Sequence, residues 1–204
     1  MKHRSPRVRT DPQVIVSRET QERLAVFEAL LRAWNPKINL VAPADLPFLR
    51  PRHIDDALAL IPLIPDATPR AIDLGSGGGF PGLILAIATG IPFDLVEADT
   101  RKSAFLREAA RVTGAPATVH QARLEAASLP PAPLVTARAL APLPRLLAFS
   151  APFLAPGGIA LFPKGQRLEE ELTQARRQWT MQTAIHQGPN GPILCVSDPC
   201  PIRP

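Results

Sequence analysis

A glycine-rich segment holds the residues whose types and spacing are best suited to ligand binding. Residues 73–82 read DLGSGGGFPG, with Asp73 ahead of the run of glycines. Glycine has no Cβ, so the backbone can approach a ligand closely and adopt dihedral angles closed to other residues. Glu97 lies 22 positions after Gly75, where a carboxylate can accept hydrogen bonds from both hydroxyls of a ribose. The pattern predicts a site for a cofactor that contains a nucleoside.

The details of this segment favour a methyl donor over a dinucleotide. Residues 77–82 match the G-x-G-x-x-G fingerprint, but the glycine that directly follows the expected strand is Gly75, and the sixth position from it is Phe80. Pro81 also removes a backbone N–H that a pyrophosphate would use. S-adenosylmethionine has no phosphate, and Asp73 offers negative charge near its ammonium and sulfonium groups. An NAD(P)-dependent oxidoreductase remains the alternative enzyme.

The site requires a strand before the glycines and a helix after them, and the chain provides this alternation from residue 70 onwards. Strands are expected at 71–74, 93–98, 117–121, 134–137 and 159–162, the last after a turn at 156–158. Helices are expected at 81–89, 100–113, 143–154 and 167–179, and a closing pair of strands at 181–187 and 193–196. This order predicts an α/β, Rossmann-like fold whose mainly parallel sheet has helices on both faces. Ligands bind at the carboxyl ends of such strands.

The first third of the chain differs, because it contains helical patterns and no clear strand. A helix is expected over 17–34, with Ser17 as its cap and Asn35-Pro36 as its end, and a second helical stretch over 52–63. The first residues carry Lys2, Arg4, Arg7 and Arg9 without an acidic neighbour. We therefore expect a basic flexible arm at 1–16, a helical cap at 17–66 and a cofactor-binding core at 67–204, with cap and core forming one compact unit.

Composition limits the partners of the chain. Its 204 residues carry a net charge of +5, which favours a polyanion such as nucleic acid, whereas 5% aromatic residues count against a single-strand binder built on base stacking. Two cysteines and four scattered histidines predict neither a metal site nor a disulfide framework. No apolar run is long enough to span a membrane, and no secretory signal is present, so we expect a cytoplasmic location.

Six segments together resemble one family of bacterial methyltransferases. They are WNPKINL at 34–40, RHIDD at 52–56, GSGGGFPG at 75–82, RKSAFLR at 101–107, RA at 138–139 and KG at 164–165. In this order and spacing, from about residue 20 to 196, the chain is similar to the RsmG family, also called GidB, which methylates N7 of a guanine in 16S ribosomal RNA. The chain departs from the family pattern at Val41 and Ala57, both in the cap.

The resemblance implies a class I methyltransferase that uses S-adenosylmethionine. It implies cofactor contacts at Gly75, Phe80, the Leu124-Glu125 pair and Arg138, which join the residues that the glycine pattern indicates. Those are Asp73, Gly77 and Glu97. Guanine N7 has a free lone pair and no proton to lose, so we predict no general base and no catalytic residue. Because a guanidinium would oppose the positive charge that forms on the base, the cofactor's carboxylate or a phosphate is the better partner for Arg138.

The substrate implied by the resemblance is 16S rRNA, either free or in the small ribosomal subunit. Candidate RNA contacts are Lys37, Asn39, Arg52, His53 and Lys164. A monomer without a metal is expected. The alternative outside the enzymes is a nucleotide-sensing RNA-binding module without turnover.

Overall fold

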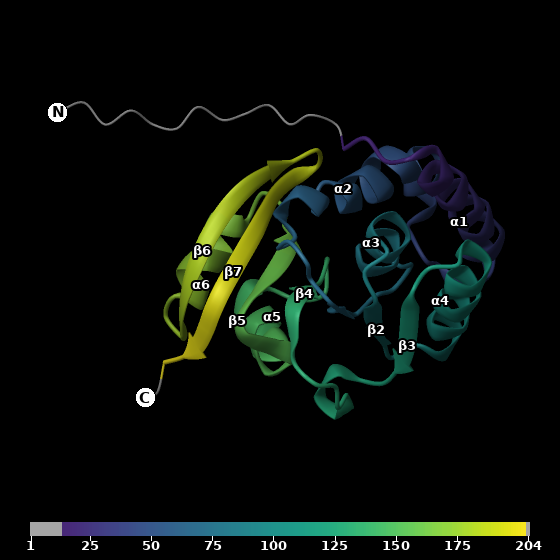
Figure 1. Cartoon of the computed structure of the whole chain (residues 1–204). Helices are drawn as coiled ribbons and strands as arrows, with labels where there is room; N and C mark the ends of the chain where they lie inside the picture. The colour runs from purple at the N-terminus through teal and green to yellow at the C-terminus, as the bar shows by residue number, and fades with distance from the viewer. Residues whose placement is uncertain (1–13, 203–204) are drawn as a thin grey trace.

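The computed structural model describes residues 14–202, and its central element is a seven-stranded sheet of order β3-β2-β1-β4-β5-β7-β6 (Figure 1). The strands are β1 Ala71–Leu74, β2 Phe93–Glu97, β3 Ala117–Gln121, β4 Ala132–Thr136, β5 Leu154–Pro163, β6 Trp179–Gly188 and β7 Gly191–Pro201. The first five strands are parallel, and β7 runs antiparallel between β5 and β6. The order reverses between β1 and β4, which is where ligands bind in such sheets.

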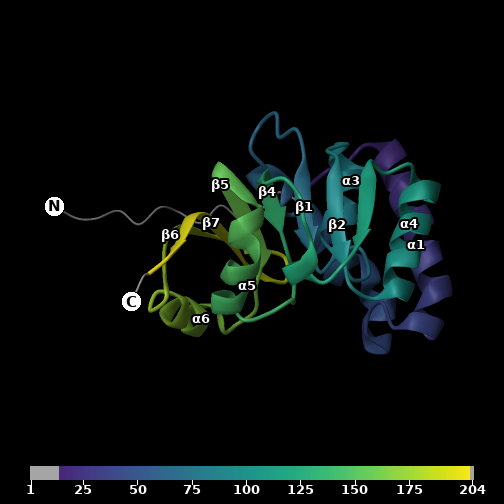
Figure 2. The same cartoon turned by 90° about the horizontal axis from the view of Figure 1, so that it is seen from below.

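Both faces of the central strands are buried, as a mainly parallel sheet requires. The helices are α1 Arg18–Ile38, α2 Asp55–Leu58, α3 Gly82–Thr89, α4 Thr100–Thr113, α5 Leu143–Ser150 and α6 Leu168–Ala175. Side chains of β4 alternate between two apolar clusters: Leu134 packs in the cluster of α1, α3 and α4, and Val135 in the cluster of α5 and α6. Figure 2 shows these two groups of helices on opposite sides of the sheet. The predicted α/β, Rossmann-like fold is confirmed.

Helix α4 begins and ends at the predicted residues because both of its ends are capped. The Asp99 carboxylate accepts hydrogen bonds from the backbone N–H groups of Arg101 and Lys102, at 2.8 and 3.0 Å. At the other end Gly114 adopts φ +61°, a left-handed conformation that favours glycine. Gly90 ends α3 in the same way, with φ +73°.

The predicted end of the first helix at Asn35-Pro36 is wrong, because α1 continues through Pro36 to Ile38. The left-handed residue that ends the helix is Asn39, whose N–H donates to the Asn35 carbonyl at 3.0 Å. The buried Asn35 side chain bonds the backbone of Val41 in both directions, at 2.9 and 3.2 Å. These bonds fix the turn that follows the helix, so Pro36 lies inside the last turn rather than beyond it.

Other boundaries also differ from the predictions; α5, for example, ends at Ser150 and not at residue 154, because β5 already starts at Leu154. The stretch 52–63 is not one helix but a π-helical turn at Arg50–Ile54, the short α2 and a 3-10 turn at Ile61–Leu63. Residues 156–158 belong to β5, where the pairing with β4 shifts register, and do not form a separate turn before it. Helix α6 ends at Ala175, earlier than predicted, because Trp179 already starts β6.

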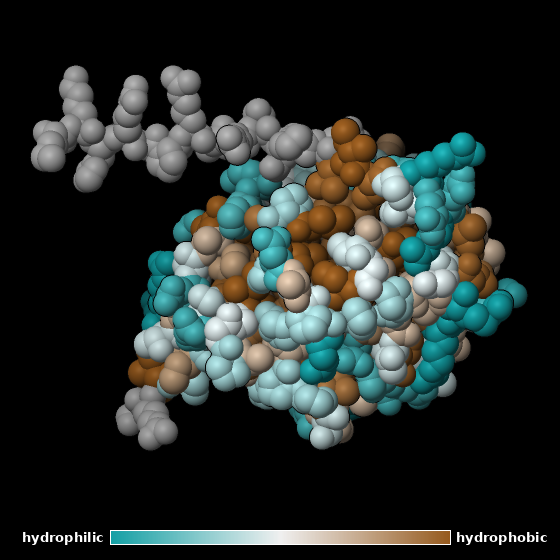
Figure 3. All heavy atoms as spheres, in the orientation of Figure 1, coloured by the Kyte–Doolittle hydropathy of each residue, from teal (hydrophilic) through white to brown (hydrophobic). Residues whose placement is uncertain are grey.

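The N-terminal helical segment shares one apolar core with the sheet. Leu24, Phe27 and Leu31 of α1 are fully buried in the cluster that also contains α3 and α4. Figure 3 shows hydrophilic residues over the side that α1 and α4 form, and hydrophobic residues gathered at the top of this face. The boundary predicted at residue 66 stays a prediction. Most of the predicted basic arm, 1–13 with its lysine and arginines, lies outside the described residues.

Candidate active site

The glycine segment forms a loop between the carboxyl end of β1 and the start of α3. Gly75 and Gly77 have φ values of +68° and +53°, which other residues adopt at a cost. The Gly75 N–H donates to the Val96 carbonyl at 2.9 Å, so the loop is joined to the end of β2. A Cβ placed on Gly77 would meet only the Gly75 carbonyl oxygen, at 3.8 Å. The space above Gly77 is therefore open to a ligand.

Glu97 lies at this loop, as predicted, and is bonded to it. One carboxylate oxygen accepts from the Gly77 N–H at 2.8 Å, and the other accepts from the Asp99 N–H at 2.8 Å. Each oxygen retains a lone pair after one such bond. The side chain thus fixes the loop and still offers acceptors for ribose hydroxyls, a contact that stays a prediction.

Asp73 is not in the crevice, so the predicted direct contact with the cofactor is not supported. Its side chain is fully buried, and one oxygen accepts a hydrogen bond of 2.6 Å from the Thr136 hydroxyl. Burial raises the pKa of Asp73 to about 6, against the opposing effect of that hydrogen bond. The carboxyl group lies behind the loop, close to Gly82 at the start of α3, where it supports the loop from inside.

The packing of Asp73 against Gly82 predicts that one methyl group added at Gly82 lowers the stability of the fold. In Gly82→Ala the new Cβ would lie 2.4 Å from the Asp73 Cβ, closer than real atoms approach, so the loop or α3 must shift. We expect the free energy of unfolding to fall by about 2 kcal/mol, the usual range for overpacking. Urea unfolding measures it.

The matched control is Gly165→Ala. A Cβ on Gly165 meets nothing within 4 Å, and this glycine has no positive φ. Its free energy of unfolding should change by less than about 1 kcal/mol. Equal effects of the two substitutions would contradict the close contact between Asp73 and Gly82.

Residues from three further segments surround the loop. Leu140, in the segment after β4, packs on Gly75, where an added Cβ would lie 2.6 Å from its Cδ1. Leu124 and Glu125 form a 3-10 turn soon after β3, with Leu124 half-buried and Glu125 exposed. Since β3 is parallel to β1 and β2, this turn follows the same edge of the sheet as the glycine loop, and its contact with the cofactor stays a prediction.

Phe80 connects the loop with the cap. Its ring is buried and packs edge-on against Phe27, with centroids 5.6 Å apart. The His53 ring lies on it as well, at 5.0 Å and an interplanar angle of 34°. Burial lowers the pKa of His53, and the charge of Arg138 lowers it further, so the neutral imidazole is favoured. Most of the Phe80 ring is thus used within the protein, and its predicted contact with the cofactor stays a prediction.

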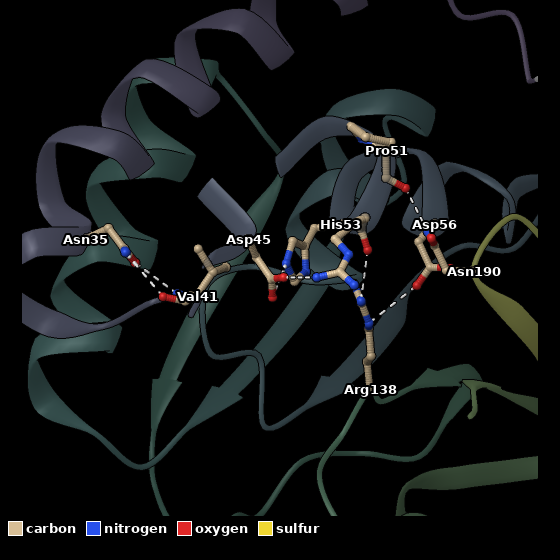
Figure 4. A network of polar contacts seen from close by, with 9 residues as sticks. Asn35, Val41, Asp45, Pro51, His53, Asp56, Arg138 and Asn190 are labelled. Carbon is tan, nitrogen blue, oxygen red and sulfur yellow. Dashed lines mark hydrogen bonds and ion pairs between the residues drawn. The ribbon is translucent and has the colours of Figure 1, made fainter. Parts of the chain in front are cut away.

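Arg138 is the centre of a polar network between the cap and the sheet (Figure 4). Its Nε lies 3.3 Å from a carboxylate oxygen of Asp56, and its Nη2 donates to the Arg52 carbonyl at 2.9 Å. Burial raises the pKa of Asp56, and the charge of Arg138 opposes that rise. Nη1 is buried and has no hydrogen-bond partner among residues 14–202. A carboxylate ligand would satisfy this nitrogen.

The residues predicted to contact RNA differ in exposure and in whether their side chains are already paired within the protein. Lys37 and Asn39 are exposed at the end of α1. Arg52 is exposed but forms an ion pair with Asp45, and the His53 Nε2 lies 3.4 Å from the same carboxylate. Lys164 is not the surface cation that was expected: its side chain is 9% exposed, and its Nζ lies 2.6 Å from Glu171.

An open cleft of about 850 Å³ adjoins the loop, and most of the residues that line it were not predicted as site residues. It lies between the segment after β4, the segment after β5 and the β6–β7 turn, and includes Leu140 and Arg138. Glu171 of α6 and Asn190 of the turn also line it. The Asn190 amide donates to the Pro51 carbonyl at 2.7 Å, a contact across 139 positions that no local pattern could have indicated.

The strand order, the glycine loop and the carboxylate at the end of β2 define a class I methyltransferase that uses S-adenosylmethionine. Its donor set fits that cofactor: an open cradle at Gly77, acceptors on Glu97 and an unsatisfied guanidinium nitrogen on Arg138. The family model described as rRNA small subunit methyltransferase G matches residues 20–190. The chain belongs to this family, which confirms the resemblance and favours a methyl donor over a nicotinamide cofactor and an enzyme over a non-catalytic module.

Relatives cover most of the chain. It is 55% identical to the ribosomal RNA small subunit methyltransferase G of Rhodospirillum centenum, over 91% of this chain and 88% of that protein. The protein of the same name from Gluconobacter oxydans is 56% identical, over 90% and 96%. Among solved structures, a ribosomal protein L11 methylase from Lactobacillus delbrueckii subsp. bulgaricus has a TM-score of 0.57 at 17% identity, over 72% and 78% of the two chains. At this identity the likeness shows the fold.

Residues 14–202 lack two further features. No helix in this range is both long enough and apolar enough to cross a bilayer. The same range contains no group of three or more histidine, cysteine or acidic residues placed to hold a metal ion.

Proposed function

We propose that this chain transfers a methyl group from S-adenosylmethionine to N7 of a guanine in 16S rRNA. The observation that carries the proposal is the pairing of two spaces at one edge of the sheet. The glycine loop leaves open space at Gly77 for the cofactor, and the cleft that adjoins it through Leu140, which Arg138 also lines, has room for a nucleotide. The names of the relatives supply the ribosomal RNA substrate, and the resemblance of the motifs supplies N7 of guanine.

The chain's own residues act by binding and orienting. When bound, S-adenosylmethionine supplies an electrophilic methyl group on sulfur. Glu97 accepts from the ribose, and the free nitrogen of Arg138 binds the carboxylate of the methionine part. The loop backbone at Gly75 and Gly77 lets the ligand approach the sheet, and Leu124-Glu125 contacts the adenine. Because N7 attacks with a lone pair and loses no proton, correct alignment and the exclusion of water account for the rate, and no general base takes part.

The RNA is bound by groups on the cap. Lys37 and Asn39 are exposed. They lie near the glycine loop, because the neighbouring Leu40 packs on it: a Cβ on Gly78 would be 3.1 Å from the Leu40 carbonyl oxygen. His53 lies beside Arg138 in Figure 4, and the Arg52 carbonyl accepts a hydrogen bond from Arg138 at 2.9 Å. We propose that the substrate is the small ribosomal subunit or its rRNA, that the enzyme acts as a monomer without a metal, and that it works in the cytoplasm, where ribosomes assemble.

A labelling experiment tests this function. Small ribosomal subunits lacking the modification are incubated with the full chain and S-adenosylmethionine labelled on the methyl group. We expect label in 16S rRNA, recovered after nuclease digestion as 7-methylguanosine. Subunits from a strain that already carries the modification are the matched control and should take up little label. Label on another base or atom, or none, would overturn the proposal.

A further inference from the structure

The cleft contains an ion pair that the reaction described so far does not use. Lys164 follows the end of β5, and Glu171 lies in α6; the Lys164 Nζ is 2.6 Å from the Glu171 Oε2. Both residues line the cleft together with Arg138, and their side chains are 9% and 20% exposed. The pair is therefore at the surface of the cleft, close to the cofactor crevice, and mostly shielded from bulk water.

The backbone around the pair is fixed on several sides. The Lys164 N–H donates to the Pro192 carbonyl at 2.8 Å. The Lys164 carbonyl oxygen packs closely on Gly191, where an added Cβ would lie only 2.8 Å from it. The Glu171 Oε2 also accepts from the Leu143 N–H, at 2.8 Å, at the start of α5. The Lys164 backbone is thus fixed by the β6–β7 turn and the Glu171 side chain by α5, and the ion pair holds the Lys164 side chain beside Glu171.

These bonds leave a donor and an acceptor side by side. Both contacts of Glu171 use its Oε2 atom. Its Oε1 atom has no hydrogen-bond partner within residues 14–202 and remains accessible to solvent. The ammonium of Lys164 has three N–H bonds, of which Glu171 takes one. The pair therefore presents an N–H donor next to a carboxylate acceptor.

We propose that Lys164 and Glu171 recognise the Watson–Crick edge of the target guanine, an inference that rests on the proposed function. Guanine presents the acceptor O6 beside the donor N1–H, which matches an ammonium beside a carboxylate. Adenine presents its N6 amino donor beside its N1 acceptor, so it would place a donor against the ammonium and an acceptor against the carboxylate. A site of buried polar groups rejects a base that leaves them unpaired. N7 lies on another edge of the purine and stays free to attack.

The charge of the pair suits the reaction as well as the base. Methyl transfer places a positive charge on the guanine ring, and an unpaired lysine near it would oppose that charge. Glu171 neutralises Lys164, so the pair is neutral overall. As positive charge spreads over the purine, N1–H becomes a stronger donor, and its bond to Oε1 strengthens toward the transition state. An interaction that is stronger in the transition state accelerates the reaction.

The first test is Glu171→Gln, with Glu169→Gln as the matched control. Glutamine keeps an acceptor for the Leu143 N–H and loses the charge, and Glu169 is exposed on the same helix. We expect kcat/KM on small subunits to fall about 10- to 100-fold in Glu171→Gln, the range of one base-reading pair. The activity of the control variant and the affinity of both variants for S-adenosylmethionine should stay unchanged. The melting temperature of Glu171→Gln should fall, because the mostly buried Lys164 loses its charged partner, so the fall in kcat/KM is compared at a temperature where the variant is fully folded.

The second test changes the base. Subunits are reconstituted with inosine or 2-aminopurine at the target position: inosine keeps O6 and N1–H, and 2-aminopurine has neither but keeps N7. The unaltered enzyme should methylate inosine nearly as fast as guanine and 2-aminopurine at least about 10-fold more slowly, and Glu171→Gln should reduce that difference. Equal losses on guanine and 2-aminopurine, or no discrimination by the unaltered enzyme, would overturn the inference. Absence of 7-methylguanosine in the labelling experiment overturns the proposed function instead.

Discussion

Arg138→Ala should lose cofactor affinity and stability at once, and a second substitution should separate the two losses. The guanidinium offers a buried, unsatisfied Nη1 to the cofactor's carboxylate, and a charged hydrogen bond contributes about 1.5–3 kcal/mol. Its loss predicts a dissociation constant for S-adenosylmethionine about 10- to 100-fold higher. Calorimetric titration measures this constant, and the labelling assay should show a loss of methyl transfer at limiting cofactor.

The cost in stability comes from Asp56. This carboxylate is almost fully buried, and without Arg138 its charge has no compensating partner among its ion pairs. Removing one member of a buried pair costs about 3 kcal/mol or more. In Arg138→Ala/Asp56→Asn the uncompensated charge is absent, so we expect most of the free energy of unfolding to return.

The double variant should not recover cofactor binding. Recovery of stability without affinity would show that Arg138 contacts the cofactor as well as the cap. If Arg138→Ala bound S-adenosylmethionine as tightly as the unaltered chain, the assigned carboxylate contact would be wrong. If both properties returned together, Arg138 would act only through the fold.

The fold could be predicted from the sequence where one local signal decides an element. Strands β1 and β3 and helix α4 have the predicted bounds, because apolar runs, the Asp99 cap and Gly114 mark them directly. The end of α1 could not be predicted in this way. Proline usually ends a helix one residue before it, but here the Asn35 side chain bonds the backbone of Val41 after the turn and fixes a later end.

In the candidate site, too, local signals could be predicted and contacts between distant segments could not. The glycines and Glu97 were found from spacing, because strand ends of a parallel sheet meet at one edge. The burial of Asp73 depends on the approach of Gly82, and the pairing of Lys164 depends on Glu171 of a later helix. Asn190 reaches Pro51 only because β7 and β6 add to the far edge of the sheet and their turn extends back to the cap. Such contacts between distant segments leave no periodic signal.

Asp73 predicts a pH dependence of stability with a defined sign. Its pKa is raised by burial to about 6 in the folded chain, against an ordinary value of 3.8. The folded chain therefore binds the proton more tightly than the unfolded chain. The stabilisation is fully present well below the unfolded-state pKa of 3.8, where both states are protonated, and is lost as the pH rises through about 6.

The size of this effect follows from a shift of about two pKa units, which corresponds to about 3 kcal/mol for a buried group. Other carboxylates, such as Asp99, have lowered pKa values and act in the opposite direction, so the unaltered chain alone does not isolate Asp73. The informative quantity is the free energy of unfolding of the unaltered chain minus that of Asp73→Asn, measured in urea between pH 4 and 7.5. We expect it to fall by about 2 to 2.5 kcal/mol over this range, because part of the effect is already lost at pH 4.

Asp66→Asn, which removes a carboxyl group that is exposed on the surface, is the matched control, and its difference from the unaltered chain is the baseline for Asp73→Asn. A difference for Asp73→Asn that does not change with pH would mean that the Asp73 carboxyl titrates normally, and hence that water reaches it behind the loop. The same measurement bears on the cofactor. If S-adenosylmethionine binds more tightly as Asp73 ionises, the negative charge behind α3 acts on the bound cation through the protein; if not, Asp73 supports the loop by packing alone.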